Sequence, residues 1–262
     1  MVNYIRIIAI LFSVLSCTPE GQWKSVKVTA VPDINQNIEI EEFGLKLVFI
    51  NKGEFNSYSL HNKKVVNIKY PFWIDRYEMT NQLYCKIMKL KTNPTEQRLA
   101  VDLVSWEDAN QFCKKLNKLC EKYIPKGYEF RLPTELEWEY ACQAGFNSDY
   151  NVEGEYDSFA WHSKNSKMQV NEPGLLRPNS WGIYDMHGNV GEWCLDSYQL
   201  DNKLSFIESS YFVTDKHFMK STRGGSYLAD IDKATSSSRF GWYKFSTNPG
   251  YGFRIVLAPI IP

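Results

Sequence analysis

The pattern of residues changes at Gly145, from segments with helical periodicity to a stretch rich in loop-forming residues, and this change limits the folds that the chain can adopt. Before Gly145, three residues of the kind that cap helices, Thr80, Ser105 and Thr134, each precede a segment with helical periodicity. After Gly145, the residues Gly, Asn, Asp, Ser and Pro are frequent, and aromatic residues stand in short runs without a helical period. We therefore expect a few helices in the first half and a loop-rich second half with short strands at most.

The segment after Ser105 is the clearest of the predicted helices. Ser105 is placed to accept hydrogen bonds from the amides of the first turn, and the apolar residues beyond it fall on one helical face. That face consists of Ala109, Phe112, Cys113, Leu116, Leu119 and Cys120. Its two cysteines are therefore expected to pack in the core rather than to bind a metal.

The segment after Thr134 begins with a capping box, because Glu137 lies three residues beyond the cap. Glu135, Glu137 and Glu139 could suggest paired catalytic carboxylates. Residues two apart on a helix point in different directions, however, and acids in the first turn interact favourably with the helix dipole. We therefore expect a structural role for these glutamates.

The folded domain is expected to span residues 43–262. Its first strands are predicted at 45–49, 65–68 and 72–75, where apolar and aromatic residues cluster. Residues 18–42 are polar and lack periodicity, which favours a flexible tether.

Residues 1–17 are predicted to form a lipoprotein signal peptide. A single positive charge at Arg6 precedes an apolar run, which ends in Ser16 and Cys17. The run is shorter than the roughly 20 residues that span a bilayer. We expect Cys17 to be acylated and the protein to be exported and lipid-anchored to the bacterial envelope, at the outer membrane or cell surface. An ordinary signal peptide or a buried helix with an incidental cysteine is the alternative.

The charge balance argues against nucleic acid as a partner. Lys plus Arg and Asp plus Glu number 30 each, and no basic run stands out. Beyond Cys17, five cysteines remain: Cys85, Cys113, Cys120, Cys142 and Cys194. An odd count leaves at least one thiol unpaired, and the sequence does not supply a connectivity. Buried, inert cysteines are the alternative to disulfides.

The interval from Arg223 to Arg254 has the composition of a binding surface. Tyr and Trp offer large rigid contact areas, and Ser, Gly and Asp offer adaptable hydrogen bonds, as in antibody paratopes. A solvated loop or an edge of the core is the alternative. The residues that we predict to contact a ligand are Tyr227, Asp230, Asp232, Phe240, Trp242, Tyr243, Phe245, Ser246 and Tyr251.

Six segments resemble, in the same order, the motifs of the formylglycine-generating enzyme (sulfatase-modifying factor) family. They are residues 72–81, 104–109, 131–141, 179–193, 223–226 and 252–254. The resemblance covers nearly all of the chain beyond the tether. It implies an α+β fold of the C-type lectin type, with few helices, twisted antiparallel sheets and much irregular loop. The fold does not by itself imply the activity.

The family's catalytic residues are not matched. Its oxygen-using members bind copper through two cysteines shortly after the Arg-Gly-Gly-Ser motif, because soft Cu(I) needs thiolate. The resemblance places Ala229 and Ala234 at those positions, and no cysteine follows Cys194. Alanine cannot ligate copper, so we expect no enzymatic activity of this kind and no required cofactor.

A related branch of the family uses non-haem iron and a histidine triad. The histidines here, His61, His162, His187 and His217, form no compact metal-binding motif. His187 is the first candidate if ligands converge in space, and a satisfied second-layer histidine is the alternative.

The resemblance also implies a structural Ca²⁺ site in the loop at residues 188–193. Asn189, Val190 and Glu192 would supply the hard oxygen ligands that calcium prefers. Position 191 is commonly Trp in the family and is Gly here, which weakens the inference from the family's packing at this site. In the alternative interpretation, Asn189 caps a turn and Glu192 pairs with an arginine.

A second resemblance concerns the variable proteins of diversity-generating retroelements, which share this fold. Their variable region runs from a similar Arg-Gly-Gly-Ser start to a similar Gly-Phe-Arg end, and some are surface lipoproteins. Residues 223–254 would then be the variable region.

Three functions remain open at this point. The first is a non-catalytic surface lipoprotein that binds an unknown protein or glycan ligand. The second is a metal-dependent oxidoreductase or maturation factor of the same family. The third is a structural lipoprotein of the envelope or of a motility complex.

Overall fold

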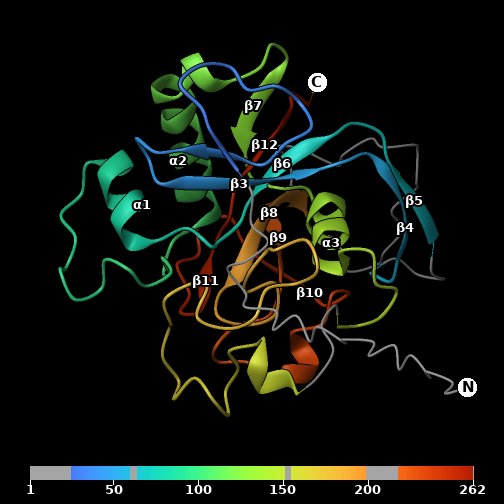
Figure 1. Cartoon of the computed structure of the whole chain (residues 1–262). Coiled ribbons are helices and arrows are strands. Elements are labelled where there is room, and N and C mark those ends of the chain that lie inside the picture. The colour runs from blue at the N-terminus through green and yellow to red at the C-terminus, as the bar shows by residue number, and fades with distance from the viewer. Residues whose placement is uncertain (1–24, 60–63, 151–154, 199–217, 262) are drawn as a thin grey trace, which may run out of the picture.

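A computed structural model describes residues 25–59, 64–150, 155–198 and 218–261. The predicted signal peptide and Cys17 lie outside these ranges, so the predicted lipid anchor stays a prediction. Within the described ranges, no helix is both long enough and apolar enough to cross a bilayer. The described residues form mixed sheets with three α-helices and long irregular connections (Figure 1). This architecture confirms the α+β fold that the motifs predicted.

The larger sheet has six strands in the order β1-β2-β3-β6-β12-β7. They are β1 (Val26–Lys27), β2 (Ile38–Ile40), β3 (Leu45–Ile50), β6 (Phe72–Asp75), β12 (Val256–Pro259) and β7 (Tyr128–Arg131). Strand β1 is parallel to β2, and the other pairs are antiparallel. The last strand of the chain, β12, therefore lies inside the sheet, between β6 and β7.

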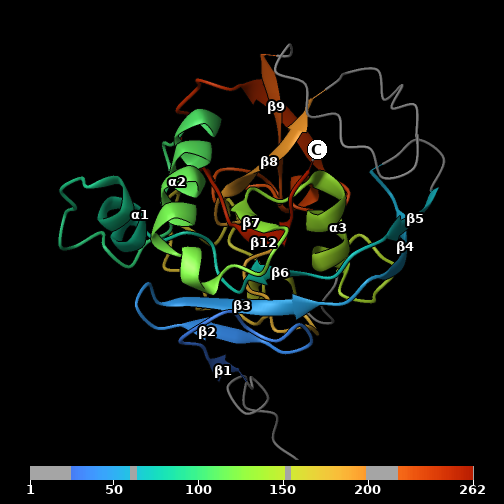
Figure 2. The same ribbon diagram turned by 90° about the horizontal axis from the view of Figure 1, so that it is seen from above.

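The second sheet has four strands in the order β10-β9-β8-β11. They are β10 (Arg239–Tyr243), β9 (Met219–Arg223), β8 (Gly191–Ser197) and β11 (Tyr251–Gly252). Strands β8 and β9 extend away from the larger sheet when the molecule is seen from above (Figure 2). A separate hairpin is formed by β4 (Gly53–Ser57) and β5 (Lys64–Ile68).

The three helices begin at the residues that the sequence predicted. They are α1 (Asn81–Met88), α2 (Trp106–Leu119) and α3 (Glu135–Gln143). The side chains of Thr80, Ser105 and Thr134 accept hydrogen bonds from first-turn amides. The predicted capping box forms at Thr134, and a second one forms at Ser105 with Asp108. Three short 3-10 helices are η1 (Glu121–Tyr123), η2 (Tyr156–Ser158) and η3 (Ile231–Lys233).

The core consists of two clusters of apolar side chains. One joins α1 and α2 to one face of the larger sheet, and the other lies under α3 and includes Trp138 and Ile74. Figure 2 shows α2 and α3 on either side of the β7 and β12 end of this sheet. On the predicted apolar face of α2, Leu119 is exposed and the other five residues are buried.

The start of the folded domain differs from the prediction. Ile38 and Ile40 are fully buried in β2, which pairs with β3, and Val26 of β1 pairs with Ile38. Residues 38–42 therefore belong to the folded domain rather than to the tether. The sequence signal was weak because β2 contains only three residues, which is too few to show a period.

No disulfide joins the cysteines of the described residues. Four of them are buried, and Cys85 is half-buried. Burial raises the pKa of Cys120 to about 12, which keeps this thiol protonated and unreactive. The interpretation of these cysteines as packed residues fits this arrangement.

Candidate functional site

The interval from Arg223 to Arg254 is held in place by three arginines that pair with glutamates. Arg223 donates to Glu139 at 3.0 Å, and neither side chain is exposed. Arg239 pairs with Glu135 at 2.6 Å. Two of the glutamates from α3 therefore anchor this interval, which agrees with the structural role that we expected for them.

The third arginine, Arg254, pairs with Glu192 in the interior. Its Nε and Nη2 each donate to a Glu192 oxygen at 2.6 Å, and Trp138 Nε1 donates to the same carboxylate at 2.7 Å. Both charged side chains are completely buried. The carboxylate of Glu192 is therefore occupied by an arginine and a tryptophan, as in the alternative to calcium binding.

Asn189 is also used within the protein. Its Oδ1 accepts from the amide of Asn171 at 2.9 Å, and its Nδ2 donates to Glu78. The amide of Val190 donates to the other oxygen of Glu78 at 3.0 Å. Among the described residues, no three or more His, Cys, Asp or Glu side chains are grouped so that they could hold a metal ion. Asn189 and Glu192 thus make contacts within the protein, and the predicted calcium site stays a prediction.

Ala229 and Ala234, where the resemblance places the family's copper ligands, differ in burial. Ala229 is half-buried and Ala234 is fully buried. A hydrogen bond of 2.6 Å joins His187 Nδ1 to the carbonyl of Ala234. Cys142 Sγ lies 3.8 Å from the other ring nitrogen of His187.

His187 is enclosed rather than accessible. Its ring packs against Phe159 and Tyr150, and burial lowers its pKa to about 4. A neutral, buried imidazole with a backbone partner fits the interpretation of a satisfied second-layer histidine. The only other described histidine, His162, is buried and bonds to Asp157 at 2.8 Å.

The nine residues predicted to contact a ligand separate into two groups. Tyr227, Asp230 and Asp232 lie at or near η3, and the other six lie on or after β10. Tyr227 is only 7% exposed, and its hydroxyl donates to Asp102 at 3.1 Å. The prediction that Tyr227 faces a ligand is therefore wrong, because its side chain supports the loop from inside. Asp230 and Asp232 are exposed.

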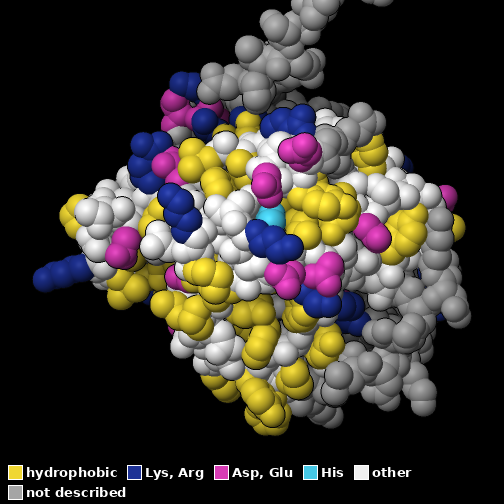
Figure 3. Space-filling model, turned by 90° about the horizontal axis from the view of Figure 1, so that it is seen from below, with side chains coloured by type: hydrophobic (Ala, Val, Ile, Leu, Met, Phe, Trp, Pro, Cys, Tyr) yellow, Lys and Arg dark blue, Asp and Glu magenta, His cyan; other side chains and the backbone are white. Residues whose placement is uncertain are grey.

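The residues of the second group surround the end of β10. Tyr243 is 64% exposed and Phe245 is 63% exposed, whereas Phe240, Trp242 and Ser246 are half-buried. Phe218, which the sequence prediction missed, is 67% exposed and accepts a backbone hydrogen bond from Lys244. It precedes the predicted interval, so only the pairing of β9 with β10 brings it there. Seen from below, hydrophobic side chains gather in a broad patch over one part of the surface (Figure 3).

Tyr251 links this surface to the core. Its ring packs on Trp242 at 5.2 Å between centroids and on Trp193 at 6.2 Å. A Cβ atom at Gly191 would lie 2.8 Å from the same ring. The glycine where the family commonly has Trp thus makes room for Tyr251.

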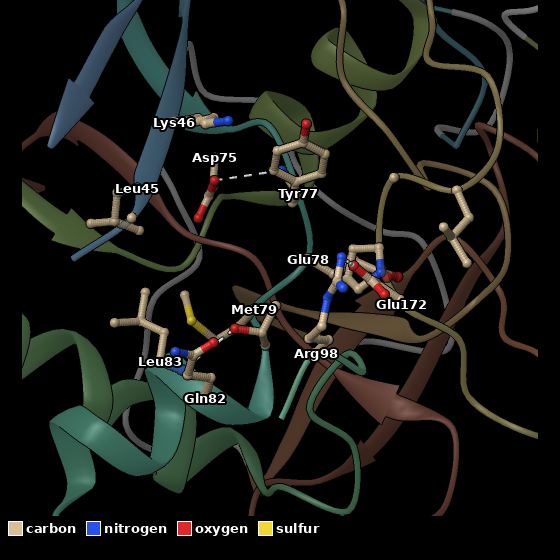
Figure 4. Close-up of a pocket in the computed structure, with 15 residues that line it drawn as sticks. Leu45, Lys46, Asp75, Tyr77, Glu78, Met79, Gln82, Leu83, Arg98 and Glu172 are labelled. Carbon is tan, nitrogen blue, oxygen red and sulfur yellow. Dashed lines mark hydrogen bonds and ion pairs between the residues drawn. The ribbon is translucent and has the colours of Figure 1, made fainter. Parts of the chain in front are cut away.

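A pocket that the sequence did not predict lies between β3, the N-terminal end of α1 and the loop at residues 172–175 (Figure 4). Its volume is about 640 Å³. An ion pair between Arg98 and Glu172 joins two of the loops that line it. Asp75 and Glu78 lie deeper, and burial raises the pKa of Asp75 to about 7. These residues come from distant parts of the chain, so no local motif marks them.

Comparison with known proteins shows what this chain resembles. The chain is 25% identical to the chaperone protein LppX of Paenibacillus barcinonensis, over 80% of this chain and 88% of that protein. It is 28% identical to the inactive C-alpha-formylglycine-generating enzyme 2 of Mus musculus, over 60% of this chain and 48% of that protein. The chain thus spans about half of the mouse protein.

Among solved structures, Treponema denticola variable protein 1 superposes with a TM-score of 0.72 and 21% identity. The match covers 87% of this chain and all of that one, and at this identity it shows a common fold. A family model, the sulfatase-modifying factor enzyme 1-like domain, matches residues 38–259. Together with the six motifs and the buried arginine pairs, this match shows that the chain belongs to the sulfatase-modifying factor family.

Proposed function

We propose that the protein is a non-catalytic binding protein, which holds its ligand with the aromatic side chains at the end of β10. The observation that carries this proposal is the exposure of Tyr243 and Phe245 beside a rigidly held strand. Exposed aromatic side chains of this size are the usual anchors of binding surfaces.

The support beneath this surface favours binding. Arg239 at the start of β10 is tied to Glu135 of α3, and Trp242 rests on Tyr251. A backbone that is already ordered loses little conformational freedom when a ligand binds, so more of the contact energy appears as affinity.

The absence of catalysis is supported by Ala229 and Ala234, which cannot act as thiolate ligands or as redox groups. A relative that covers 60% of this chain is itself named as inactive. His187 does not replace the missing ligands, because it is buried and bonded to a backbone carbonyl.

We further propose that Cys17 anchors the protein to the envelope and that residues 223–254 are diversified. The shared fold with a variable protein supports the second point. A search of the DNA beside the gene would test it. A near copy of the codons for residues 223–254 next to a reverse transcriptase is expected, and its absence would remove the diversification.

The binding surface is tested by replacing Tyr243 and Phe245 with Ala, singly and together. Glycan arrays and displayed libraries of linear peptides would first supply a ligand for the unmodified protein. Each single change is expected to weaken binding of that ligand at least tenfold, because each removes an anchor. The melting temperature should change little, because both side chains are largely exposed.

Val65→Ala is the matched control, since Val65 is 69% exposed on the separate β5. Trp242→Ala is expected to lower stability as well as binding, because Trp242 packs on Tyr251. Unchanged binding in the Tyr243 and Phe245 double variant would refute the proposed surface.

A second candidate function is a maturation factor, which the similarity to the chaperone protein LppX favours. A chaperone would suppress the aggregation of an unfolding secreted enzyme at stoichiometric amounts. If the purified protein does so, and if the Tyr243 and Phe245 double variant is equally effective, the maturation role replaces the proposed one.

A further inference from the structure

Strand β10 is the outer strand of its sheet. The order β10-β9-β8-β11 leaves one side of β10 without a neighbouring strand among the described residues. An exposed outer strand presents unpaired backbone groups, and it is a template for another strand. The question is which groups β10 presents.

The pairing with β9 determines the direction of each backbone group of β10. The amide of Lys244 donates to the carbonyl of Phe218 at 2.7 Å, and the register continues without a bulge through Trp242↔Lys220 and Phe240↔Thr222. In an antiparallel ladder, every second residue forms the bonded pair and the residues between point the other way. Gly241 and Tyr243 therefore direct their N–H and C=O groups away from β9.

An independent bond agrees with this assignment. Met219, which pairs with Tyr243, uses its carbonyl to accept from Tyr198, which follows β8. The carbonyl of Met219 thus points away from β10, as the same alternation requires.

The free side of β10 offers a specific set of donors and acceptors. Ser246 donates to the carbonyl of Tyr243 at 2.8 Å, so that carbonyl is occupied. Within the described part of the chain, the amide of Tyr243 and both backbone groups of Gly241 have no hydrogen-bond partner. Along the edge, the N–H of Gly241, the C=O of Gly241 and the N–H of Tyr243 thus form a row of donor, acceptor and donor.

The side chains beside this row are aromatic on both faces. Alternation along the strand puts Phe240 and Trp242 on one face and Tyr243 on the other. Tyr198 covers Gly241 on the Tyr243 face, since a Cβ atom at Gly241 would lie 2.0 Å from its ring. Aromatic side chains therefore lie on both faces of β10, next to the edge that an added strand would use.

We propose that β10 binds an extended peptide segment of a partner protein by strand addition, with apolar side chains of the peptide at alternate positions. This proposal rests on the proposed binding function and names the class of ligand for that site. Main-chain bonds to Gly241 and Tyr243 supply affinity, and the rings of Phe240, Trp242 and Tyr243 supply specificity. A peptide fits better than a second copy of this chain, because another β10 would bring a Tyr243 carbonyl that is already occupied.

The test compares Tyr243→Ala with Tyr243→Pro. Both variants lose the tyrosine ring, but only proline loses the outward N–H. Proline leaves the bonds between β9 and β10 intact, because the amide of Tyr243 does not take part in them. The probe is a linear peptide selected from a displayed random library on the unmodified full chain. We expect Tyr243→Pro to bind this peptide at least tenfold more weakly than Tyr243→Ala does.

A second measurement does not depend on the folding of the proline variant. Methylation of single backbone nitrogens in the selected peptide should weaken binding at alternate positions only, because only those N–H groups face β10. Equal binding by the proline and alanine variants, or no periodicity in the methylation series, would overturn strand addition.

Other outcomes distinguish this inference from the proposed function. Binding of glycans alone, with loss in the Tyr243→Ala and Phe245→Ala variants, would overturn strand addition and leave the aromatic surface intact. Dimers that are lost in Tyr243→Pro and retained in Tyr243→Ala would assign the edge to a second copy instead. Binding that is unaffected by Tyr243→Ala, Phe245→Ala and Tyr243→Pro alike would refute the surface and the strand addition together.

Discussion

Gly191 and Tyr251 show how single residues in this protein depend on distant ones. The glycine follows a loop motif, and the aromatic ring that fills its space is supplied by a residue sixty positions later. The sequence shows a glycine where the family commonly has Trp, and the structure shows that the ring of Tyr251 fills the space of the missing side chain. A long-range replacement of this kind leaves no local pattern, so it could not be predicted from one sequence.

The substitution Gly191→Ala is expected to destabilise the protein by about 1–3 kcal/mol, because the new methyl group would overpack the Tyr251 ring. Chemical denaturation would measure the change. The double variant with Tyr251→Ala should be less destabilised than the sum of the two single variants. Strict additivity would show that the two residues are not coupled.

The secondary-structure elements differ in how far they could be predicted. The three helix starts were visible because a cap and the amide that it binds lie within one turn. Sheet β10-β9-β8-β11 was not, because its pairs join residues that are tens of positions apart and its strands lack a clear alternation. For the same reason, the ligand-facing residues were predicted as one interval, whereas the fold separates Tyr227 from Tyr243.

The N-terminal cap of α2 allows a test of how one helix is stabilised. Ser105→Ala removes the acceptor for the Asp108 amide, which lies at 3.1 Å, and leaves the core contacts of the helix unchanged. The free energy of unfolding is expected to fall by about 1 kcal/mol. Ser105→Thr keeps the hydroxyl and serves as the control. A loss in the control as large as in the alanine variant would show that packing, rather than capping, determines this position.

The molecule as a whole carries an excess of buried acid around one arginine. Asp75, Glu78, Asp185 and Glu192 are all buried near Arg254. Burial raises the pKa of Asp185 to about 6, and it raises the pKa of Glu78 well above the usual value. The cluster joins three separate segments of the chain, which is why the sequence showed its members but not their proximity.

This cluster predicts a dependence of stability on pH. The pKa of Asp75 is about 7 in the folded protein and near 3.8 when unfolded, so the folded state binds the proton more tightly. Protonated Asp75 therefore stabilises the folded protein fully below pH 3.8. This stabilisation declines as the pH rises and is lost above the folded-state pKa of about 7. Asp75→Asn removes this dependence. As the pH rises from 4 to 7, the free energy of unfolding of the variant should increase, relative to that of the unmodified protein, by on the order of a few kcal/mol.

Urea denaturation at several pH values would measure this difference. His187 works in the opposite direction, because burial lowers its pKa to about 4 and stability is lost as the pH falls below the usual value near 6.5. Since both proteins contain His187, its effect cancels in the comparison. Asp232→Asn, at an exposed position, is the control and should leave the pH profile unchanged. A parallel profile for Asp75→Asn would refute the prediction.

The position of β12 inside the larger sheet determines when the protein can fold. Strands β6 and β7 have no common neighbour until residues 256–259 enter between them, and a long stretch of chain separates these residues from both strands. The larger sheet therefore cannot close until residues 256–259 have paired with both strands, and long-range strand pairing of this kind is a slow step in folding.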